Sequence, residues 1–466
     1  MTPGPAVILG GIIVLAALVY PLRAWMRLAA FVAAAATLAL AVLGLTLLLD
    51  EAIKIGERTV MLGEPLRGLG YVLRVTELER PPLVMLSLIA AVSFIGMWLQ
   101  QAERTFLSVG LVLLALWMAA IMVQPATGAL PLLALASCLA AFALPRAPRA
   151  AFRQLWWPLI AYALGTVAAW HAQEAAFAVV DVEHLQIAAR LMGLALLVLL
   201  APIPLHAPAV SLLADAPPLI GAFLLLGSQV VVLHTIWSIF VEWPWMAQQI
   251  EVSRTLAIAG LATMLWGALG AMTADRVQRL WAYATLHDWG VFLLGLSLGA
   301  PLEWRTAAVF FVSRSVGVCL SAYGIASLRT RLPEDDWLAV QGQMRRLPWT
   351  ALSILVGGLG LCGFPLTASF AARWGLSQTL LLTEPVWALW IVAGQLGVAL
   401  GYLHLLQAFL APAPADARPA RRETIAGVVL LTFGVFLSGL LALVPQFTDG
   451  IVQTITGLMR GLGPLR

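Results

Sequence analysis

Long apolar runs recur along the whole 466-residue chain, separated by short polar segments. Each is about 17 to 25 residues long, the length that a helix needs to cross roughly 30 Å of hydrocarbon. The pattern predicts an all-α polytopic membrane protein with about 14 transmembrane helices. The expected spans are 4–22, 28–49, 82–100, 105–123, 127–145, 155–172, 186–204, 217–241, 254–273, 280–299, 305–327, 350–380, 385–411 and 424–445.

Composition supports this class, because 61% hydrophobic and 11% charged residues are too apolar for a soluble protein of this length. No soluble domain is expected. The first run lacks a small-residue cleavage site and further spans follow it, so it is expected to be a retained helix.

Arginines indicate the orientation, because cytoplasmic loops retain positive charge. If the N-terminus is outside, most arginines between spans fall on the cytoplasmic side. The outer segment from Asp50 to Arg80 then carries six acids against five bases. We therefore expect a multi-pass protein of a prokaryotic inner (cytoplasmic) membrane with both termini on the outer side. The net charge of +4 reflects this topology, and no nucleic-acid partner is indicated.

Two segments interrupt the apolar pattern with proline and glycine. They are Ala201 to Pro208 and Gly360 to Phe370, in the seventh and twelfth expected spans. Broken helices at membrane depth are tolerated where they are buried in protein or line a water-filled cavity. Their matching positions in two halves favour an inverted-repeat transporter, although prolines also kink packed helices that transport nothing.

Three motifs resemble those of one family. They are the segment from Pro204 to Pro217 with His206, the run Arg279 to Thr285, and the run Gly363 to Trp374. In this order and spacing they resemble the antiporter-like membrane subunits of NADH-quinone oxidoreductase (complex I) and Mrp antiporters, most nearly the subunit N (ND2-like) type.

The resemblance implies two inverted repeats, spans 4 to 8 and 9 to 13, with spans 7 and 12 broken. The expected parts are residues 1–104 with the outer loop 50–81, the repeats 105–241 and 254–411, and 424–466 with the last helix and tail. It also implies a proton path along buried lysines and a glutamate.

Most of those relay residues are missing, because Lys54 is the only lysine and lies in a polar segment. The family's lysine on span 7 corresponds to Leu199 and that on span 8 to Gln229. The glutamate on span 5 has Leu135 near its place. The position on span 12 is Arg373. The histidine that usually ends the span-10 motif is replaced by Asp288, with His287 beside it.

These replacements change the chemistry. Buried lysine can lose its proton near working pH, because burial lowers its pKa. Arginine stays protonated in proteins, so Arg373 can supply a permanent positive charge but relays protons poorly. Gln229 can order water, and Leu199 cannot. We expect the path through the first half to be closed.

Other polar residues inside the spans are further candidates for an ion path. Arg314 interrupts span 11, and an intramembrane charge suggests function. Alternatively, it pairs with an acid such as Asp288 or with helix-end carbonyls. His234 on span 8 could replace a lysine as carrier, and His404 on span 13 could serve an exit path. Either histidine could also be a core residue whose ring nitrogens are hydrogen-bonded within the protein.

His206 and Asp215 frame the loop of span 7, where structural capping is the favoured role. No cofactor, metal or redox site is indicated, because the three cysteines are scattered singly and phosphate loops and dinucleotide motifs are absent. Any electron transfer would occur in partner subunits, so whether the chain counts as part of an NADH:quinone oxidoreductase-type enzyme is left open.

Three functions fit these observations. The chain could be an ion-translocating subunit of a complex I-like, Mrp-like or membrane-hydrogenase-like assembly, handling protons or monovalent cations, with translocation altered or confined to the second half. It could be a non-conducting scaffold that links other membrane subunits in the bilayer. It could also be a stand-alone transporter in which Arg373 and Arg314 form the binding charge.

Overall fold

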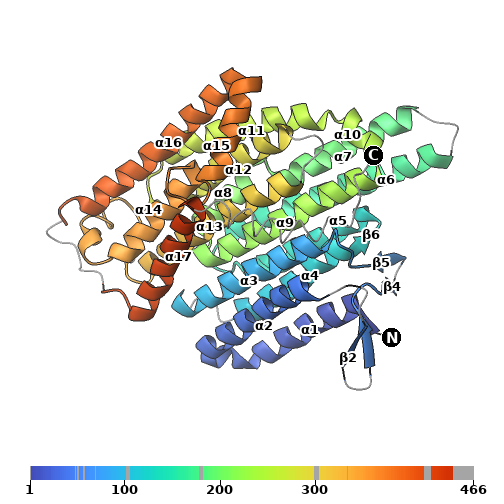
Figure 1. Cartoon of the computed structure of the whole chain (residues 1–466), viewed down its shortest axis with the longest axis horizontal. Helices are drawn as coiled ribbons and strands as arrows, with labels where there is room; N and C mark the ends of the chain where they lie inside the picture. Colours follow the sequence, from blue (N-terminus) through green and yellow to red (C-terminus); the bar gives the residue numbers. More distant parts are fainter. Residues whose placement is uncertain are drawn as a thin grey trace. The chain divides into compact units, whose positions relative to one another are not determined.

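The computed structural model describes residues 2–47, 49, 52–55, 58–68, 70–100, 105–177, 182–298, 304–332, 334–413 and 421–443. Within them the chain forms 17 α-helices (Figure 1). Eight are long and apolar enough to cross a membrane, and four shorter helices are also apolar. The all-α polytopic class is confirmed. The count of about 14 spans and the inverted repeats stay predictions.

The chain divides into two compact units. The first comprises Met1–Ala201 with Phe223–Val252, and the second comprises Pro202–Ala222 with Ser253–Gln453. The boundary between the predicted repeats, 105–241 and 254–411, lies close to the boundary between the units at Val252 and Ser253. The units differ from the repeats because 202–222 belongs to the second unit.

The first unit begins with α1 (Gly4–Val19), a 3-10 turn η1 (Pro21–Trp25), α2 (Met26–Thr46) and α3 (Arg80–Gln100). It continues with α4 (Phe106–Met122), η2 (Ala126–Gly128), α5 (Ala129–Phe142), α6 (Pro148–Phe177) and α7 (Val182–Leu200). Most of α9 (Pro218–Glu242) and α10 (Pro244–Gln249) complete it. Aromatic rings from α3, α4 and α9 form part of its core: the ring of Phe223 lies 5.4 Å from that of Phe94 and 5.1 Å from that of Trp117.

The segment between α2 and α3, expected as a polar loop, forms short strands. Strands β1 (Thr2–Pro3), β3 (Arg58–Met61) and β2 (Ala52–Ile55) make one sheet in that order, with β2 and β3 antiparallel and Ile53 opposite Val60. Strands β4 (Leu66–Gly68), β5 (Tyr71–Leu73) and β6 (Val123–Gln124) make a second sheet. These strands pair backbone groups of a segment whose composition is too polar for a spanning helix.

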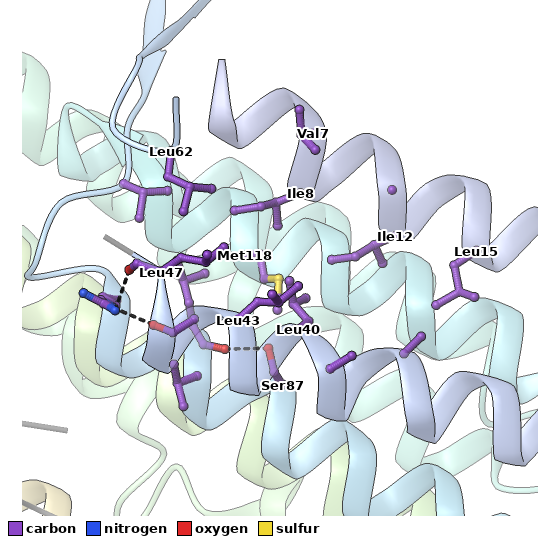
Figure 2. A pocket seen from close by; sticks show the side chains of 18 of the residues that line it. Val7, Ile8, Ile12, Leu15, Leu40, Leu43, Leu47, Leu62, Ser87 and Met118 are labelled. Carbon is purple, nitrogen blue, oxygen red and sulfur yellow. Dashed lines mark hydrogen bonds between the residues drawn. The ribbon is translucent and has the colours of Figure 1, made fainter. Parts of the chain in front are cut away.

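A cavity of about 560 Å³ opens between α1, α2 and α3 and is lined almost entirely by apolar side chains (Figure 2). Buried Arg80 lies at its edge. Its guanidinium donates to the carbonyls of Gly44, Leu45 and Leu47, at 2.6, 3.0 and 2.7 Å. Arg80 therefore satisfies carbonyls that the last turn of α2 leaves without helical partners.

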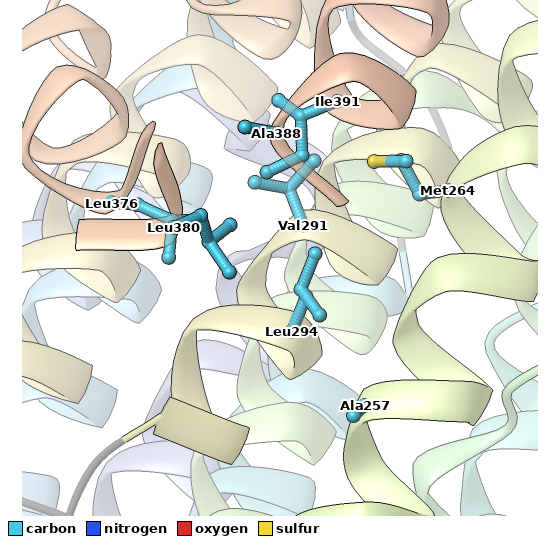
Figure 3. Close-up of a cluster of buried hydrophobic side chains, with 8 residues drawn as sticks. All are labelled: Ala257, Met264, Val291, Leu294, Leu376, Leu380, Ala388 and Ile391. Atoms are coloured by element: carbon cyan, nitrogen blue, oxygen red, sulfur yellow. The ribbon is translucent and has the colours of Figure 1, made fainter. Parts of the chain in front are cut away.

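The second unit contains α8 (Ala207–Asp215), α11 (Val252–Met272), α12 (Val277–Leu298), α13 (Trp304–Arg329) and the turn η3 (Gln343–Arg345). The helices α14 (Pro348–Cys362), α15 (Phe370–Thr383), α16 (Pro385–Leu410) and α17 (Ile425–Leu443) follow. A buried apolar cluster joins α11, α12, α15 and α16 (Figure 3). Its members include Met264, Val291, Leu376 and Ile391.

Both predicted helix breaks are confirmed. The first separates α7 from α8 at 201–206, where Ala201 has a positive φ of 49°. The second separates α14 from α15 at 363–369. Gly363, directly after α14, adopts the left-handed conformation with φ 76°, which glycine tolerates at a helix end.

Candidate functional site: a buried Arg–Asp–Arg cluster

Asp288, in the middle of α12, forms ion pairs with two arginines. Nε of Arg314, on α13, lies 2.5 Å from Oδ2 of Asp288. Nη2 of Arg373, on α15, donates to the other carboxylate oxygen. All three residues are at most 4% exposed. The cluster joins three helices and places two guanidinium charges around one carboxylate.

The helix break explains the position of Arg373. This residue lies in the first turn of α15, and Nη2 also donates to the carbonyl of Leu361 at 2.5 Å. The hydroxyl of Ser369 donates to the carbonyl of Gly360. The end of a helix carries partial negative charge and unsatisfied carbonyls, so a cation there is stabilising. Arg373 therefore links the end of α14 to Asp288.

Aromatic rings surround the guanidinium of Arg314. Its Cζ lies 4.9 Å from the centre of the Trp289 ring and 5.5 Å from that of Phe311. Arginine is weakly hydrated and interacts favourably with ring faces, so it tolerates this environment better than lysine. Arg314 is thereby oriented toward Asp288.

Close backbone packing of α11 against α12 positions His287. A Cβ atom added to Gly290 would lie 2.2 Å from the backbone nitrogen of Met264, and one added to Gly267 would lie 2.3 Å from that of His287. Only glycine permits this approach. Nδ1 of His287 donates to the carbonyl of Met264 at 3.1 Å. In the neutral ring, Nε2 then holds the lone pair and can accept a proton.

Nε2 of His287 is buried and has no hydrogen-bond partner among the described residues, and the same holds for Nη1 of Arg373. Both atoms are polar and belong to residues at or beside the cluster. Such groups are costly to bury unless water or a proton-exchanging group pairs with them.

The comparisons with known proteins agree with this architecture. Residues 172–399 match the family described as NADH:quinone oxidoreductase/Mrp antiporter, transmembrane region. The segment 172–399 therefore matches the transmembrane region of this antiporter-like family.

Two relatives of this chain are named as subunit N proteins. NADH-quinone oxidoreductase subunit N 2 of Acidobacterium capsulatum is 29% identical over 182 residues, 38% of this chain and 37% of the relative. Subunit N 1 of Solidesulfovibrio magneticus is 29% identical over 273 residues, 57% of this chain and 58% of the relative. The chain thus matches 37% of the length of the first relative and 58% of the length of the second.

One solved structure shares the fold of this chain along nearly its whole length. A chain in the Mrp complex from Dietzia sp. DQ12-45-1b superposes with a TM-score of 0.79 over 98% of this chain and 97% of that chain. The identity is 16%, so the likeness concerns the fold alone.

In the second unit, the structure brings four of the predicted site residues together. Asp288, Arg314 and Arg373 form the cluster, and His287 adjoins it on α12. The expectation that Arg314 pairs with an acid such as Asp288 is confirmed. His404 lies elsewhere: it is exposed on α16, and its ring lies 6.5 Å from that of Trp337.

In the first unit, His234 and Gln229 are buried on α9. Nε2 of His234 donates to the carbonyl of Ile121 at 3.1 Å and lies 3.2 Å from the hydroxyl of Ser238. Leu199 is half-buried on α7. Among the described residues, no charged side chain is buried in α4, α5, α6, α7 or α9.

Leu135 does not lie where the resemblance implied. It is 53% exposed on α5, whereas Ser137, two residues later, is 5% exposed. A residue on the exposed face of a helix cannot line a path inside the unit, so Leu135 does not occupy a buried relay position. A shift of one or two residues in the alignment of this sequence with the family moves a position to another face of the helix.

His206 and Asp215 flank α8, in the second unit. Asp215 forms an ion pair with Arg276, 3.0 Å from Nη2 to Oδ1. His206 occupies the N-cap position, but its side chain makes no capping hydrogen bond, so the expected capping role is wrong for this histidine. Partial burial lowers the pKa of His206 below its ordinary value. Its ring lies 6.1 Å from that of Trp266.

Gln278, which sequence reasoning missed, anchors α8 to α12. Its buried amide nitrogen donates to the carbonyls of Leu213 and Ala216 at 2.7 and 2.5 Å. Its amide oxygen accepts from Nη1 of Arg329 at 2.8 Å. Gln278 lies directly before the second family-like motif, which begins at Arg279, and nothing in the sequence indicated this role.

Within the described part of the chain, no group of three or more His, Cys, Asp or Glu side chains is arranged to hold a metal ion. In the cluster, both arginines remain protonated at any working pH. The neutral ring of the neighbouring His287 is a group beside the cluster that can accept a proton.

Proposed function

We propose that this chain is a membrane subunit of a complex I-like, Mrp-like or membrane-hydrogenase-like assembly, and that it translocates protons through its second unit only. The family match and the Mrp-type fold support the first part. The ion pairs of Asp288 with Arg314 and Arg373 are the observation that supports the second part. Intramembrane charges are costly and mark ion pathways in membrane proteins.

The two kinds of side chain have different roles in this proposal. Arg314 and Arg373 supply fixed positive charge that orients water around the carboxylate of Asp288. His287 exchanges a proton at Nε2, since Nδ1 is engaged with the carbonyl of Met264. Movement of Arg373 at the break between α14 and α15 would change the charge beside this ring.

The first unit is closed to protons in this proposal. Its helices α4 to α7 and α9 contain no buried charged side chain among the described residues, and Leu199 stands where the family resemblance implies a relay lysine. His234 is then a core histidine bound to the carbonyl of Ile121. Its hydrogen bond stabilises the packing of α9 against α4.

The expected partners are other membrane subunits of the same assembly and the lipid bilayer, with protons or monovalent cations as the transported species. Redox chemistry belongs to the partner subunits, and this chain needs no cofactor. The distribution of arginine supports a prokaryotic inner-membrane topology with both termini on the outer side.

A second candidate is a non-conducting scaffold. The observation that favours it is the same cluster, because two arginines cannot release protons and could serve only to hold three helices together. The two functions predict different rates of proton uptake for variants that remove the charge of Arg373 and variants that keep it.

Proton uptake into vesicles that contain the intact assembly distinguishes them. We expect Arg373→Ala to lower the uptake rate at least tenfold, and Arg373→Lys to retain much of it because the positive charge remains. Assembly of the complex is checked for each variant by native electrophoresis. A fully assembled Arg373→Ala complex with unchanged uptake would establish the scaffold and overturn conduction through the second unit.

A further inference from the structure

Two histidines lie together in the first unit, away from every residue discussed above. His171 belongs to the last part of α6, and His184 to the first turn of α7, which lies beside α6 (Figure 1). The centres of their rings are 5.1 Å apart, with 49° between the ring planes. The ring of Trp170 is 4.7 Å from His171 and 6.5 Å from His184.

The His171 imidazole has a free nitrogen. Nδ1 of His171 is buried and has no hydrogen-bond partner among the described residues. Both imidazole rings are half-buried. A buried polar nitrogen without a partner is uncommon in folded proteins and calls for water, an ion or another ligand.

The separation of the rings suits a shared metal ion. Zinc binds imidazole nitrogen at about 2.0–2.1 Å with tetrahedral angles, and the nitrogen lies roughly 1.1 Å from its ring centre, so two imidazoles on one ion have ring centres roughly 5 Å apart. The observed 5.1 Å agrees with this value. Because aromatic rings in simple contact also lie about 4.5 to 7 Å apart, the unpaired Nδ1 of His171 is the second observation that the site requires.

We propose that His171 and His184 bind one divalent transition-metal ion of the Zn²⁺, Ni²⁺ or Cu²⁺ class, one imidazole nitrogen from each. These are the ions that imidazole ligands favour. Because no third His, Cys, Asp or Glu completes a cluster within the described residues, water fills the remaining positions. The bound ion joins the end of α6 to the start of α7.

The site stabilises the folded state when it is filled, because a ligand that binds only the native protein adds RT ln(1 + [L]/Kd) to its stability. The bond between α6 and α7 would restrict these helix ends. Metal binding here is independent of the proposed proton path, because neither histidine belongs to the cluster around Asp288.

The test uses the full chain, purified in detergent with an affinity tag that contains no histidine. Titration calorimetry with Ni²⁺ or Zn²⁺ compares the wild type with His171→Ala, His184→Ala and the control Gln173→Ala. Gln173 is exposed on the same part of α6 and has no imidazole. Each histidine variant is expected to bind at least tenfold more weakly, whereas the control retains wild-type affinity.

Two further measurements distinguish loss of the metal site from misfolding of a variant. Ni²⁺ should raise the midpoint of thermal unfolding for the wild type and Gln173→Ala but not for either histidine variant, whose midpoints without metal should match the wild type. Cu²⁺ should quench the fluorescence of the wild type more than that of Trp170→Phe. Wild-type affinity in either histidine variant, or no saturable binding by the wild type, would overturn the two-histidine site.

Discussion

Asp288 on α12 and Arg314 on α13 form an ion pair in which both side chains are almost completely buried and Nε lies 2.5 Å from Oδ2. The same carboxylate also binds Arg373, beside the helix break. Removing one charge of such a pair leaves its partner buried and uncompensated, which is more costly than losing the attraction alone. We therefore expect the stability of the second unit to depend strongly on Asp288.

Asp288→Asn should destabilise the chain strongly. The asparagine keeps the shape but leaves two guanidinium groups without a counter-charge, at a cost of about 3 to 5 kcal/mol. Thermal unfolding in detergent measures the effect. Asp275→Asn is the matched control, because Asp275 pairs with Arg279 at 3.3 Å on the surface and should change stability by about 0.5 kcal/mol or less. Equal midpoints for the two variants would refute the structural role of the cluster.

Arg80→Met should destabilise the first unit. The substitution keeps an apolar stem but removes the donors to three carbonyls at the end of α2, and each buried acceptor left unpaired costs about 1 to 3 kcal/mol. Arg67→Met is the control, since Arg67 is exposed on β4. The same unfolding assay applies, and an unchanged midpoint for Arg80→Met would show that water replaces the guanidinium without loss.

Gly290→Ala should disturb the packing of α11 against α12. The new Cβ would lie 2.2 Å from the backbone nitrogen of Met264, so the helices must separate, and overpacking of this kind costs about 1 to 3 kcal/mol. Gly439→Ala on α17 is the control, because nothing lies within 4 Å of its added Cβ. There the change should be neutral or slightly stabilising, since alanine favours helices. Comparable losses in both variants would contradict the close approach.

Sequence alone predicted the fold class and both helix breaks, because apolar run length and the positions of Gly and Pro are local properties. It also identified Arg314, Asp288 and Arg373 as candidates. It did not predict that Arg373 reaches Asp288 across 85 residues, since that contact depends on how α12 and α15 pack.

Several positions could not be predicted for physical reasons. Leu135 was expected near the place of the family's glutamate, but it is 53% exposed. The direction of a side chain turns by about 100° with each residue of a helix, so an error of one or two residues in the alignment with the family changes which face is meant. The strands between α2 and α3 depend on backbone pairing between distant segments. The pairing of His171 with His184 depends on the packing of α6 against α7, although their spacing of thirteen residues is visible in the sequence.

The most direct test of the account compares two buried histidines in the same proton-uptake assay. His287, in the second unit, donates through Nδ1 and His234, in the first, through Nε2, each to a helix carbonyl at 3.1 Å; asparagine can keep the first bond and glutamine the second. In vesicles that contain the assembled complex, His287→Asn should lower proton uptake at least tenfold, while His234→Gln should retain the wild-type rate. Wild-type uptake by His287→Asn, or a comparable loss in His234→Gln, would contradict a path confined to the second unit.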